Sequence, residues 1–366
     1  MKKITIILGL TALILSGVGC QKDGIDDDTS FLETATATAP GKVFDISNDN
    51  SGNVKITPTG EGASSFIVKF GHGTGSSAQA EVMPGNSATH AYPEGSYTVT
   101  IISKSISGKE TSADHPLQVT YRAPENLDVT TTQNVHTLKV KASARYAASY
   151  MVYFGDVPNE AGTPLANGGE VSHTYPGAGT YNLKVVALSG GAAKTEKVTP
   201  VTIYNALGFP ITFDQTTINY FFGTFGDNQQ FAVVNNPDAS GLNTSAKVGR
   251  FTRGNQSWSG TYTPLDLPID MANGKKIRVL AYNPDPAMVG RQLNVELEAG
   301  SSLSNGVAVL KTAFTTSGAW EELVFDFGTI AAIPATEKFK QLVLRFNDGA
   351  NGAGALIYVD NFRQTN

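Results

Sequence analysis

The sequence predicts an all-β protein made of β-sandwich domains arranged in series. Short stretches alternate hydrophobic and polar residues with a period of two, which is typical of half-buried strands. Gly, Pro, Asn and Asp separate these stretches, and 38 glycines and 17 prolines occur among the 366 residues. A duplicated pattern, at an offset of 84 residues between Phe66 and Tyr150, divides the N-terminal part into two similar units. At about 100–200 residues per domain, the length allows two to four domains.

Composition and charge exclude several classes of function. Charged residues make up 16% of the chain, the net charge is −5, and no basic run follows residue 3. Nucleic-acid binding requires a cationic surface, so we expect no nucleic-acid partner. A single cysteine excludes a disulfide framework and cysteine-clustered metal sites. All five histidines lie at or before position 173, so the second half of the chain lacks the base that serine or cysteine catalysis uses.

The N-terminus has the pattern of an export signal. Lys2 and Lys3 precede an apolar stretch at 4–18, which is too short for a stable membrane span. The sole cysteine, Cys20, follows Gly19, and this pattern resembles a bacterial lipoprotein signal. The resemblance implies that residues 1–19 are removed and that Cys20 is acylated, which makes the protein lipid-anchored. An ordinary signal peptide cleaved near Gly19 is the alternative.

Residues 20–40 are predicted to be a flexible acidic tether. They begin with Gln-Lys-Asp at 21–23 and Asp-Asp-Asp at 26–28, and a Thr/Ala-rich stretch follows. The acidic residues resemble the signal that sends Bacteroidota lipoproteins to the outer leaflet of the outer membrane. The resemblance implies an outer-membrane protein that faces the cell exterior. The same residues are also compatible with a plain solvated linker.

The repeat predicts two sandwiches, at 41–122 and 123–204. Tyr-Met-Val-Tyr-Phe-Gly at 150–155 matches Phe-Ile-Val-Lys-Phe-Gly at 66–71, and each copy continues with a His-x-Tyr and a later tyrosine. These motifs resemble the polycystic-kidney-disease-type (PKD) domain, which implies an immunoglobulin-like β-sandwich. The first copy has His72 where the family has Asp, and the second keeps Asp156.

His90 and His173 occupy equivalent positions in the two copies. Each precedes a turn, and no second histidine lies at a spacing typical of metal ligands. We therefore expect each of them to make a fixed structural hydrogen bond rather than to bind metal or to catalyse a reaction.

Residues 205–366 contain no copy of the repeat and are predicted to form a β-jelly-roll. At least eight strand-like segments, at irregular spacing, lie between residues 209 and 362. Both tryptophans lie here, in a region rich in tyrosine and phenylalanine. Sugars have apolar C–H faces and polar rims, so glycan sites combine an aromatic platform with amides, carboxylates and arginines.

One segment combines these residue types within ten positions. It runs from Arg253 through Trp258 to Tyr262 and resembles the Arg–x–x–x–Trp–x–Gly segment of jelly-roll carbohydrate-binding modules. The resemblance implies that Trp258 stacks on the ligand, whereas Trp320, at the start of an alternating strand, is expected in the core. Phe221 and Phe222 are either loop anchors or part of the cleft wall, with the core preferred. The predicted glycan-binding residues are Trp258, Tyr262, Arg250, Arg253, Tyr282, Glu296 and Arg345.

Strand parity supports a polar face on this module. In the segments 277–282, 293–298 and 341–346 the hydrophobic residues share one side, which leaves Arg278, Tyr282, Glu296 and Arg345 on the other. If these strands are neighbours, their polar residues form one patch. An ordinary solvated sheet face is the alternative. The jelly-roll resemblance also implies a structural calcium ion held by Asp214 and Asp360, and no catalytic cofactor.

The sequence favours a binding protein over an enzyme. Glu296 and Glu298 lie two residues apart, but the Glu-x-Asp-x-x-Glu motif of jelly-roll β-glucanases is missing. The domain order resembles Bacteroidota glycan-binding lipoproteins of the SusE/SusF position. This implies a polysaccharide ligand, with laminarin (a β-1,3-glucan) as the best guess, and SusC/SusD-type importer proteins as partners. The alternatives are a structural or adhesive surface protein and a glycoside hydrolase.

Overall fold

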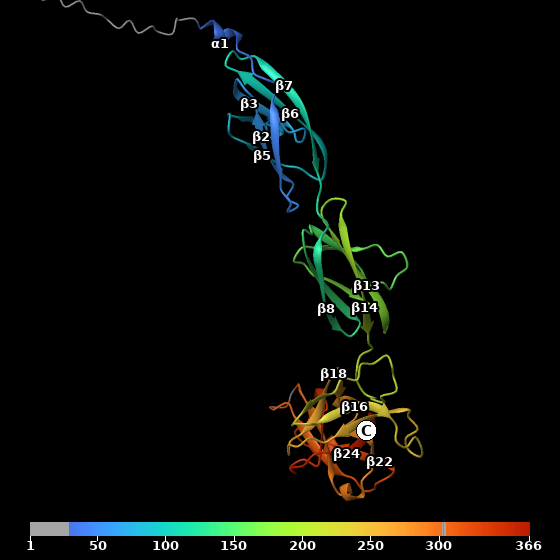
Figure 1. Cartoon of the computed structure of the whole chain (residues 1–366). Coiled ribbons are helices and arrows are strands. Elements are labelled where there is room, and N and C mark those ends of the chain that lie inside the picture. The colour runs from blue at the N-terminus through green and yellow to red at the C-terminus, as the bar shows by residue number, and fades with distance from the viewer. Residues whose placement is uncertain (1–28, 302, 304) are drawn as a thin grey trace, which may run out of the picture. The chain divides into compact units, whose positions relative to one another are not determined.

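The computed structural model describes residues 29–366 except residues 302 and 304, and this part of the chain is all-β (Figure 1). Its strands form six antiparallel sheets. The predicted signal peptide, the acylated Cys20 and the acidic residues 21–28 lie outside the described residues. Among the residues described, no helix is long and apolar enough to cross a membrane.

The first sandwich packs a three-stranded sheet, β1-β2-β5, against a four-stranded sheet, β4-β3-β6-β7. Val54 and Ile56 of one sheet meet Val68, Val99 and Ile101 of the other in a buried core, as the period of two requires. The strands are β1 (Gly41–Ile46), β2 (Asn53–Thr59), β3 (Ala63–Lys69), β4 (Gln79–Val82), β5 (Ala88–Ala91), β6 (Gly95–Ser105) and β7 (Glu110–Val119), with a 3₁₀ turn at Gly75–Ala78.

The second sandwich repeats this arrangement with β12-β9-β8 and β11-β10-β13-β14. Its core contains Val140, Tyr150, Val152 and Val185. The strands are β8 (Glu125–Asn134), β9 (Thr137–Arg145), β10 (Ser149–Tyr153), β11 (Thr163–Ala166), β12 (Val171–Thr174), β13 (Gly179–Leu188) and β14 (Lys194–Ile203).

The duplicated residues perform the same structural task in both copies. The buried Tyr92 donates its hydroxyl to the Phe70 carbonyl at 3.0 Å, and the equivalent Tyr175 donates to the Phe154 carbonyl at 3.1 Å. Burial raises the pKa of Tyr92 to about 12, so its hydroxyl keeps its proton and remains a donor.

The equivalent histidines also have fixed partners, as expected. His90 stacks on Phe70 and lies 3.0 Å from His72 (Nε2 to Nδ1). His173 stacks on Phe154, and its Nε2 lies 2.7 Å from the Asp156 carboxylate.

The segment before the first sandwich is more ordered than the prediction of a flexible tether through residue 40. A short helix, α1 (Ser30–Thr34), is followed by backbone that lies along β6 and β7. Ser107 donates to the Ala35 carbonyl, Thr111 to the Ala37 carbonyl and Ser103 to the Thr38 carbonyl. These hydrogen bonds attach residues 35–38 to the sandwich.

The third sandwich places two five-stranded sheets face to face, β15-β18-β23-β20-β21 and β16-β17-β24-β19-β22. A broad apolar core lies between them, in which Phe251, Val279, Val295 and Leu344 are fully buried. The strands are β15 (Gly223–Phe225), β16 (Gln230–Asn235), β17 (Lys247–Thr252), β18 (Gly260–Asp270), β19 (Lys276–Tyr282), β20 (Gln292–Glu298), β21 (Ala308–Ala313), β22 (Trp320–Asp326), β23 (Lys338–Phe346) and β24 (Leu356–Thr365), with 3₁₀ turns at Met271–Asn273, Pro286–Met288 and Phe327–Thr329.

Candidate functional site

The outer face of the sheet β15-β18-β23-β20-β21 carries the candidate site. β20 and β23 are neighbours, with Asn294 opposite Arg345 and Glu296 opposite Val343. The hydrophobic residues of β20 point into the core, so its alternate residues point to the outer face. Parity therefore predicted correctly which side Glu296 and Arg345 occupy.

An aromatic platform lies along one side of this face. It consists of Trp258, Phe225, Tyr262 and Phe221. The Trp258 and Phe225 rings are parallel within 6°, with centroids 6.1 Å apart, and Phe221 meets Tyr262 edge-on at 6.3 Å. Trp258 and Phe221 are 50% and 51% exposed. Two large aromatic rings that are half open to solvent can cover the apolar faces of a ligand.

Two glycines allow the rings to lie flat on the strands. A Cβ on Gly223 would come within 2.5 Å of the Tyr262 ring, and a Cβ on Gly260 within 2.6 Å of the Phe225 ring. Gly223 is opposite Tyr262 and Gly260 is opposite Phe225 in the β15–β18 pair. Each ring thus lies across the glycine of the neighbouring strand.

Polar groups lie beside the platform and are paired with one another. Arg345 Nε lies 3.0 Å from Glu296 Oε1 without being aligned for a hydrogen bond, and its guanidinium carbon lies 5.4 Å from the Phe225 ring centroid. Burial raises the pKa of Glu296, and the nearby Arg345 opposes that rise. Gln341 donates to the Glu298 carboxylate at 2.5 Å.

A hollow of about 240 Å³ joins the platform to these polar groups. It is lined by Phe225, Tyr262, Glu298, Gln341, Val343 and Arg345. Of the predicted residues, the structure thus brings Tyr262 and Arg345 to one hollow, with Trp258 and Glu296 in contact with its walls. Phe225, Gln341 and Glu298 were not predicted as ligands, although strand parity already placed Glu298 on this side of the sheet.

Arg253 does not face this hollow, which corrects its prediction as a glycan ligand. It is only 3% exposed, and its guanidinium donates to the backbone carbonyls of Phe346, Ala350 and Gly352. The last two carbonyls belong to the glycine-rich loop between β23 and β24. Arg253 therefore holds this loop against the segment that carries Trp258.

Arg250 and Tyr282 also lie away from the hollow, because β17 and β19 belong to the opposite sheet. The parity of 277–282 was correct, but the condition for a single patch is not met, because this strand does not neighbour the other two. Neither residue can therefore contact a ligand on the Trp258 face.

Two of the remaining aromatic residues pack against apolar side chains: Phe222 lies against the core between the sheets, whereas Trp320 is buried in a separate cluster with Val248 and Leu280 on the outer face of its sheet. Trp320, in the same sheet as Tyr282, is 6% exposed and donates from Nε1 to the Asp238 carbonyl at 2.8 Å. Phe222 stacks on Phe231 against the core.

Asp214 and Asp360 form part of an oxygen-rich cluster near the start of β17. Asp360 is fully buried, and one of its carboxylate oxygens, Oδ2, has no hydrogen-bond partner among the described residues. Burial raises the pKa of Asp360 to about 6, while Ser245, the Asn361 N–H and Asn243 oppose the rise. Asp214 accepts from Lys247 N at 2.8 Å. In the described ranges, no group of three or more His, Cys, Asp or Glu side chains is arranged to hold a metal ion.

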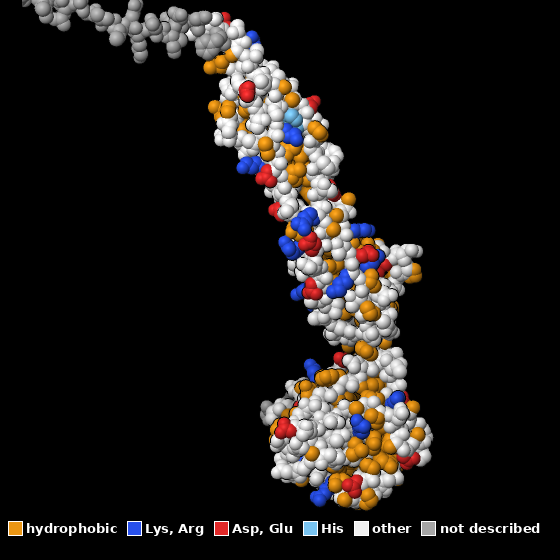
Figure 2. All heavy atoms as spheres, viewed as in Figure 1, with side chains coloured by type: hydrophobic (Ala, Val, Ile, Leu, Met, Phe, Trp, Pro, Cys, Tyr) orange, Lys and Arg blue, Asp and Glu red, His pale blue; other side chains and the backbone are white. Residues whose placement is uncertain are grey.

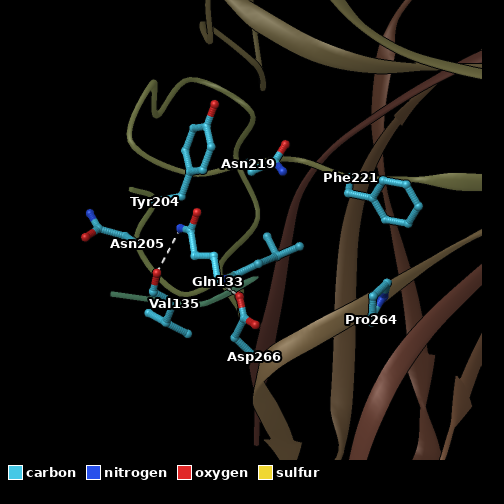
Figure 3. A pocket seen from close by; sticks show the side chains of 9 residues that line it. Gln133, Val135, Tyr204, Asn205, Asn219, Phe221, Pro264 and Asp266 are labelled. Carbon is cyan, nitrogen blue, oxygen red and sulfur yellow. Dashed lines mark hydrogen bonds between the residues drawn. The ribbon is translucent and has the colours of Figure 1, made fainter. Parts of the chain in front are cut away.

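A further hollow, of about 300 Å³, contains none of the predicted ligands (Figure 3). Tyr204, Asn205 and Asn219 lie on one side of the view and Phe221 and Pro264 on the other. The Gln133 side chain, which lines the hollow, donates from Nε2 to the Val135 carbonyl at 2.9 Å, so this amide already has a partner. The hollow shares only Phe221 with the aromatic platform.

No protein-family model and no curated protein matches the chain. One similar solved structure comes from a study of the promiscuous specificity of carbohydrate-binding modules of the β-sandwich superfamily, and it is 15% identical to this chain. The match covers 66% of this chain and 98% of that structure, with a TM-score of 0.30. A family 11 carbohydrate-binding module from Clostridium thermocellum, in complex with a β-1,3-1,4-mixed-linked tetrasaccharide, is 10% identical (42% and 95% covered, TM-score 0.31). An adhesin domain of Lys-gingipain from Porphyromonas gingivalis is 15% identical (42% and 96%, TM-score 0.29).

Proposed function

We propose that the third sandwich binds a polysaccharide without cleaving it, on the outer face of β15-β18-β23-β20-β21. The observation that carries this proposal is the half-exposed Trp258, parallel to Phe225 and next to a hollow lined by Tyr262, Gln341 and Arg345. Ring faces beside amide, carboxylate and guanidinium groups match the apolar faces and hydroxyl rims of sugars.

The charges of the site favour a neutral sugar chain. Arg345 is the one cation among the six lining residues, and it is close to Glu296 at 3.0 Å and to Asp348 at 3.8 Å. Glu298 adds a further carboxylate. An anionic ligand would therefore meet a surface whose carboxylates outnumber its cations, whereas hydroxyl groups can donate to these oxygens.

The arrangement favours binding over hydrolysis. A glycosidase needs two carboxyl groups on either side of the scissile bond. Glu296 is 4% exposed and close to Arg345, and Glu298 already accepts from Gln341. The competing adhesive function predicts a buried Trp258 without a cleft, and the exposure of Trp258 opposes it.

The same proposal includes the membrane anchor, the identity of the glycan and the importer that receives it. Acylation at Cys20 anchors the protein to the outer membrane on the exterior side, and the PKD-like sandwiches serve as spacers. The ligand is β-1,3-glucan (laminarin), which the protein presents to a SusC/SusD-type importer. Confinement at a membrane raises the effective concentration of binding sites, so weak binding to each site suffices for a polymer.

Calorimetric titration tests the binding function. The chain from residue 21 onward, which lacks the predicted acylated cysteine, is titrated with laminarin, mixed-linkage β-glucan, α-mannan and starch. We expect micromolar-to-millimolar binding to laminarin, and no reducing ends released on long incubation. If another of the four glycans binds instead, that glycan replaces laminarin as the proposed ligand. If none of the four binds detectably, the neutral-glycan proposal is refuted. Turnover that is lost in Glu296→Gln would establish the hydrolase instead.

We also propose a structural calcium ion at Asp360 and Asp214. The free Asp360 oxygen, the Asp214 carboxylate and the nearby Ser245 hydroxyl offer the hard oxygen ligands that calcium prefers. Calcium addition to chelator-treated protein should raise the unfolding temperature, and Asp360→Asn should abolish that rise. An unfolding temperature that is the same with calcium and with chelator would refute the site.

A further inference from the structure

The opposite sheet of the third sandwich carries a second row of aromatic and cationic side chains. Arg250 is opposite Tyr358, Tyr358 is opposite Tyr282, and Tyr282 is opposite Trp320, so the four residues lie side by side across β17, β24, β19 and β22. The residues next to them in these strands, such as Phe251, point into the core, so this row points to the outer face. We call it the arginine–tyrosine row.

The tyrosines of this row form an amphipathic surface. Tyr282 and Tyr358 meet edge-on with centroids 5.9 Å apart, and Tyr282 lies 5.5 Å from the buried Trp320. Both tyrosines are partly exposed. Figure 2 shows hydrophobic side chains gathered on the third sandwich where β22 and β24 are labelled in Figure 1.

Arg250 lacks the partners that arginines in folded proteins usually have. Within the part of the chain that the structure describes, its guanidinium makes no ion pair or hydrogen bond, and its Nε is buried without an acceptor. A guanidinium presents five N–H donors in a planar fork, and leaving a buried donor without an acceptor is unfavourable. The terminal nitrogens of the guanidinium are not among the buried atoms, so a ligand with oxygen acceptors can supply the partners that they lack.

The charges on this face differ in sign from those on the face proposed to bind neutral glycan. Farther along the sheet, Arg278 and Arg363 both contact Glu322, so this cluster carries two cations and one carboxylate. Asp360, two residues after Tyr358 in β24, adds one carboxylate to this face, and with its pKa raised to about 6 it is ionised at neutral pH, so Arg250, Arg278 and Arg363 outnumber Glu322 and Asp360 by one. The face is thus cationic although the chain carries a net charge of −5.

We propose that the arginine–tyrosine row is a second carbohydrate site, which takes a sugar bearing a carboxylate or sulfate group. Tyr282 and Tyr358 contact the apolar face of the sugar ring, and Arg250 donates two hydrogen bonds to the acidic group, the geometry that a guanidinium fork favours. The site lies on the other sheet from the aromatic platform. It can therefore exist whether or not the neutral-glycan site does.

Titration with two acidic probes tests the second site. The chain from residue 21 onward is titrated with a galacturonic-acid hexamer and a sulfated heparin hexasaccharide, at low and at physiological salt. We expect binding of at least one probe. Arg250→Gln should weaken it by about tenfold or more, and Arg250→Lys should restore only part of the affinity, because an ammonium cannot form the bidentate pair.

Two variants show whether binding is specific to this row. Arg363→Gln removes a charge from the same face but not from the row, and it should weaken binding by less than about threefold. Trp258→Ala should leave the affinity for the acidic probes unchanged, because Trp258 lies on the other face. The neutral-glycan proposal is tested separately, by titration with the neutral glycans. The inference is overturned if neither probe binds, if Arg363→Gln and Arg250→Gln weaken binding equally, or if folded Arg250→Lys and Arg250→Gln both bind like the unmodified protein.

Discussion

Replacing Trp258 by alanine gives the sharpest test of the neutral-glycan site. Trp258 is half exposed, is not part of the apolar core of the third sandwich, and stacks only on Phe225 among the described aromatic rings. We therefore expect the variant to fold, with a free energy of unfolding within about 1 kcal/mol of the original value.

The expected loss of affinity follows from the exposed area. A tryptophan side chain offers about 250 Å², so half of it leaves about 125 Å² for a ligand to cover. At about 25 cal/mol per Å², covering all of this area contributes about 3 kcal/mol, and covering a single ring face about half as much. The predicted loss is therefore about 10–150-fold in Kd.

The assay is calorimetric titration with the best neutral glycan, alongside thermal unfolding of both proteins. Leu242→Ala is the matched control, because Leu242 is also exposed (63%) but lies in the loop between β16 and β17, away from the platform. It should leave the affinity unchanged. An affinity of Trp258→Ala within twofold of the original, with the fold intact, would show that the platform does not contact the ligand.

Three further predictions concern the framework. Arg253→Gln leaves the carbonyls of Phe346, Ala350 and Gly352 without this donor and should destabilise the third sandwich by about 3 kcal/mol, seen as a lower unfolding temperature. A variant of unchanged stability would contradict the structural role of Arg253. Burial and the nearby His72 lower the pKa of His90, so the first sandwich should have its full stability above about pH 6.5 and lose it as the pH falls through the His90 pKa. His72→Asp, which supplies the carboxylate that Asp156 supplies in the second sandwich, should remove this acid sensitivity in melts from about pH 5 to 8, and an unaltered pH profile would refute the pairing. Tyr175→Phe deletes the bond to the Phe154 carbonyl and should cost about 1 kcal/mol in denaturant unfolding, against no change for the exposed-loop variant Leu242→Ala.

Local patterns in the sequence were enough to predict the all-β class and much of the residue orientation. A strand alternates its side chains with a period of two residues in any sheet, so the sides occupied by Glu296, Arg345 and Tyr282 were readable without knowing the partners of the strands. The repeat similarly revealed the shared tyrosine and histidine positions, because the same local contacts recur in each copy.

Only the tertiary structure decided which strands lie next to one another. The pattern of β19 left open whether it neighbours β20 and β23. β17 and β19 both lie in the other sheet, so Arg250 and Tyr282 are separated from Trp258 and Tyr262. The pairing of distant strands depends on how the whole core closes, and it cannot be inferred from the sequence of a single strand. The burial of Arg253 has the same origin: two of its acceptors come from a loop almost a hundred residues later, and only the closed fold brings that loop to it.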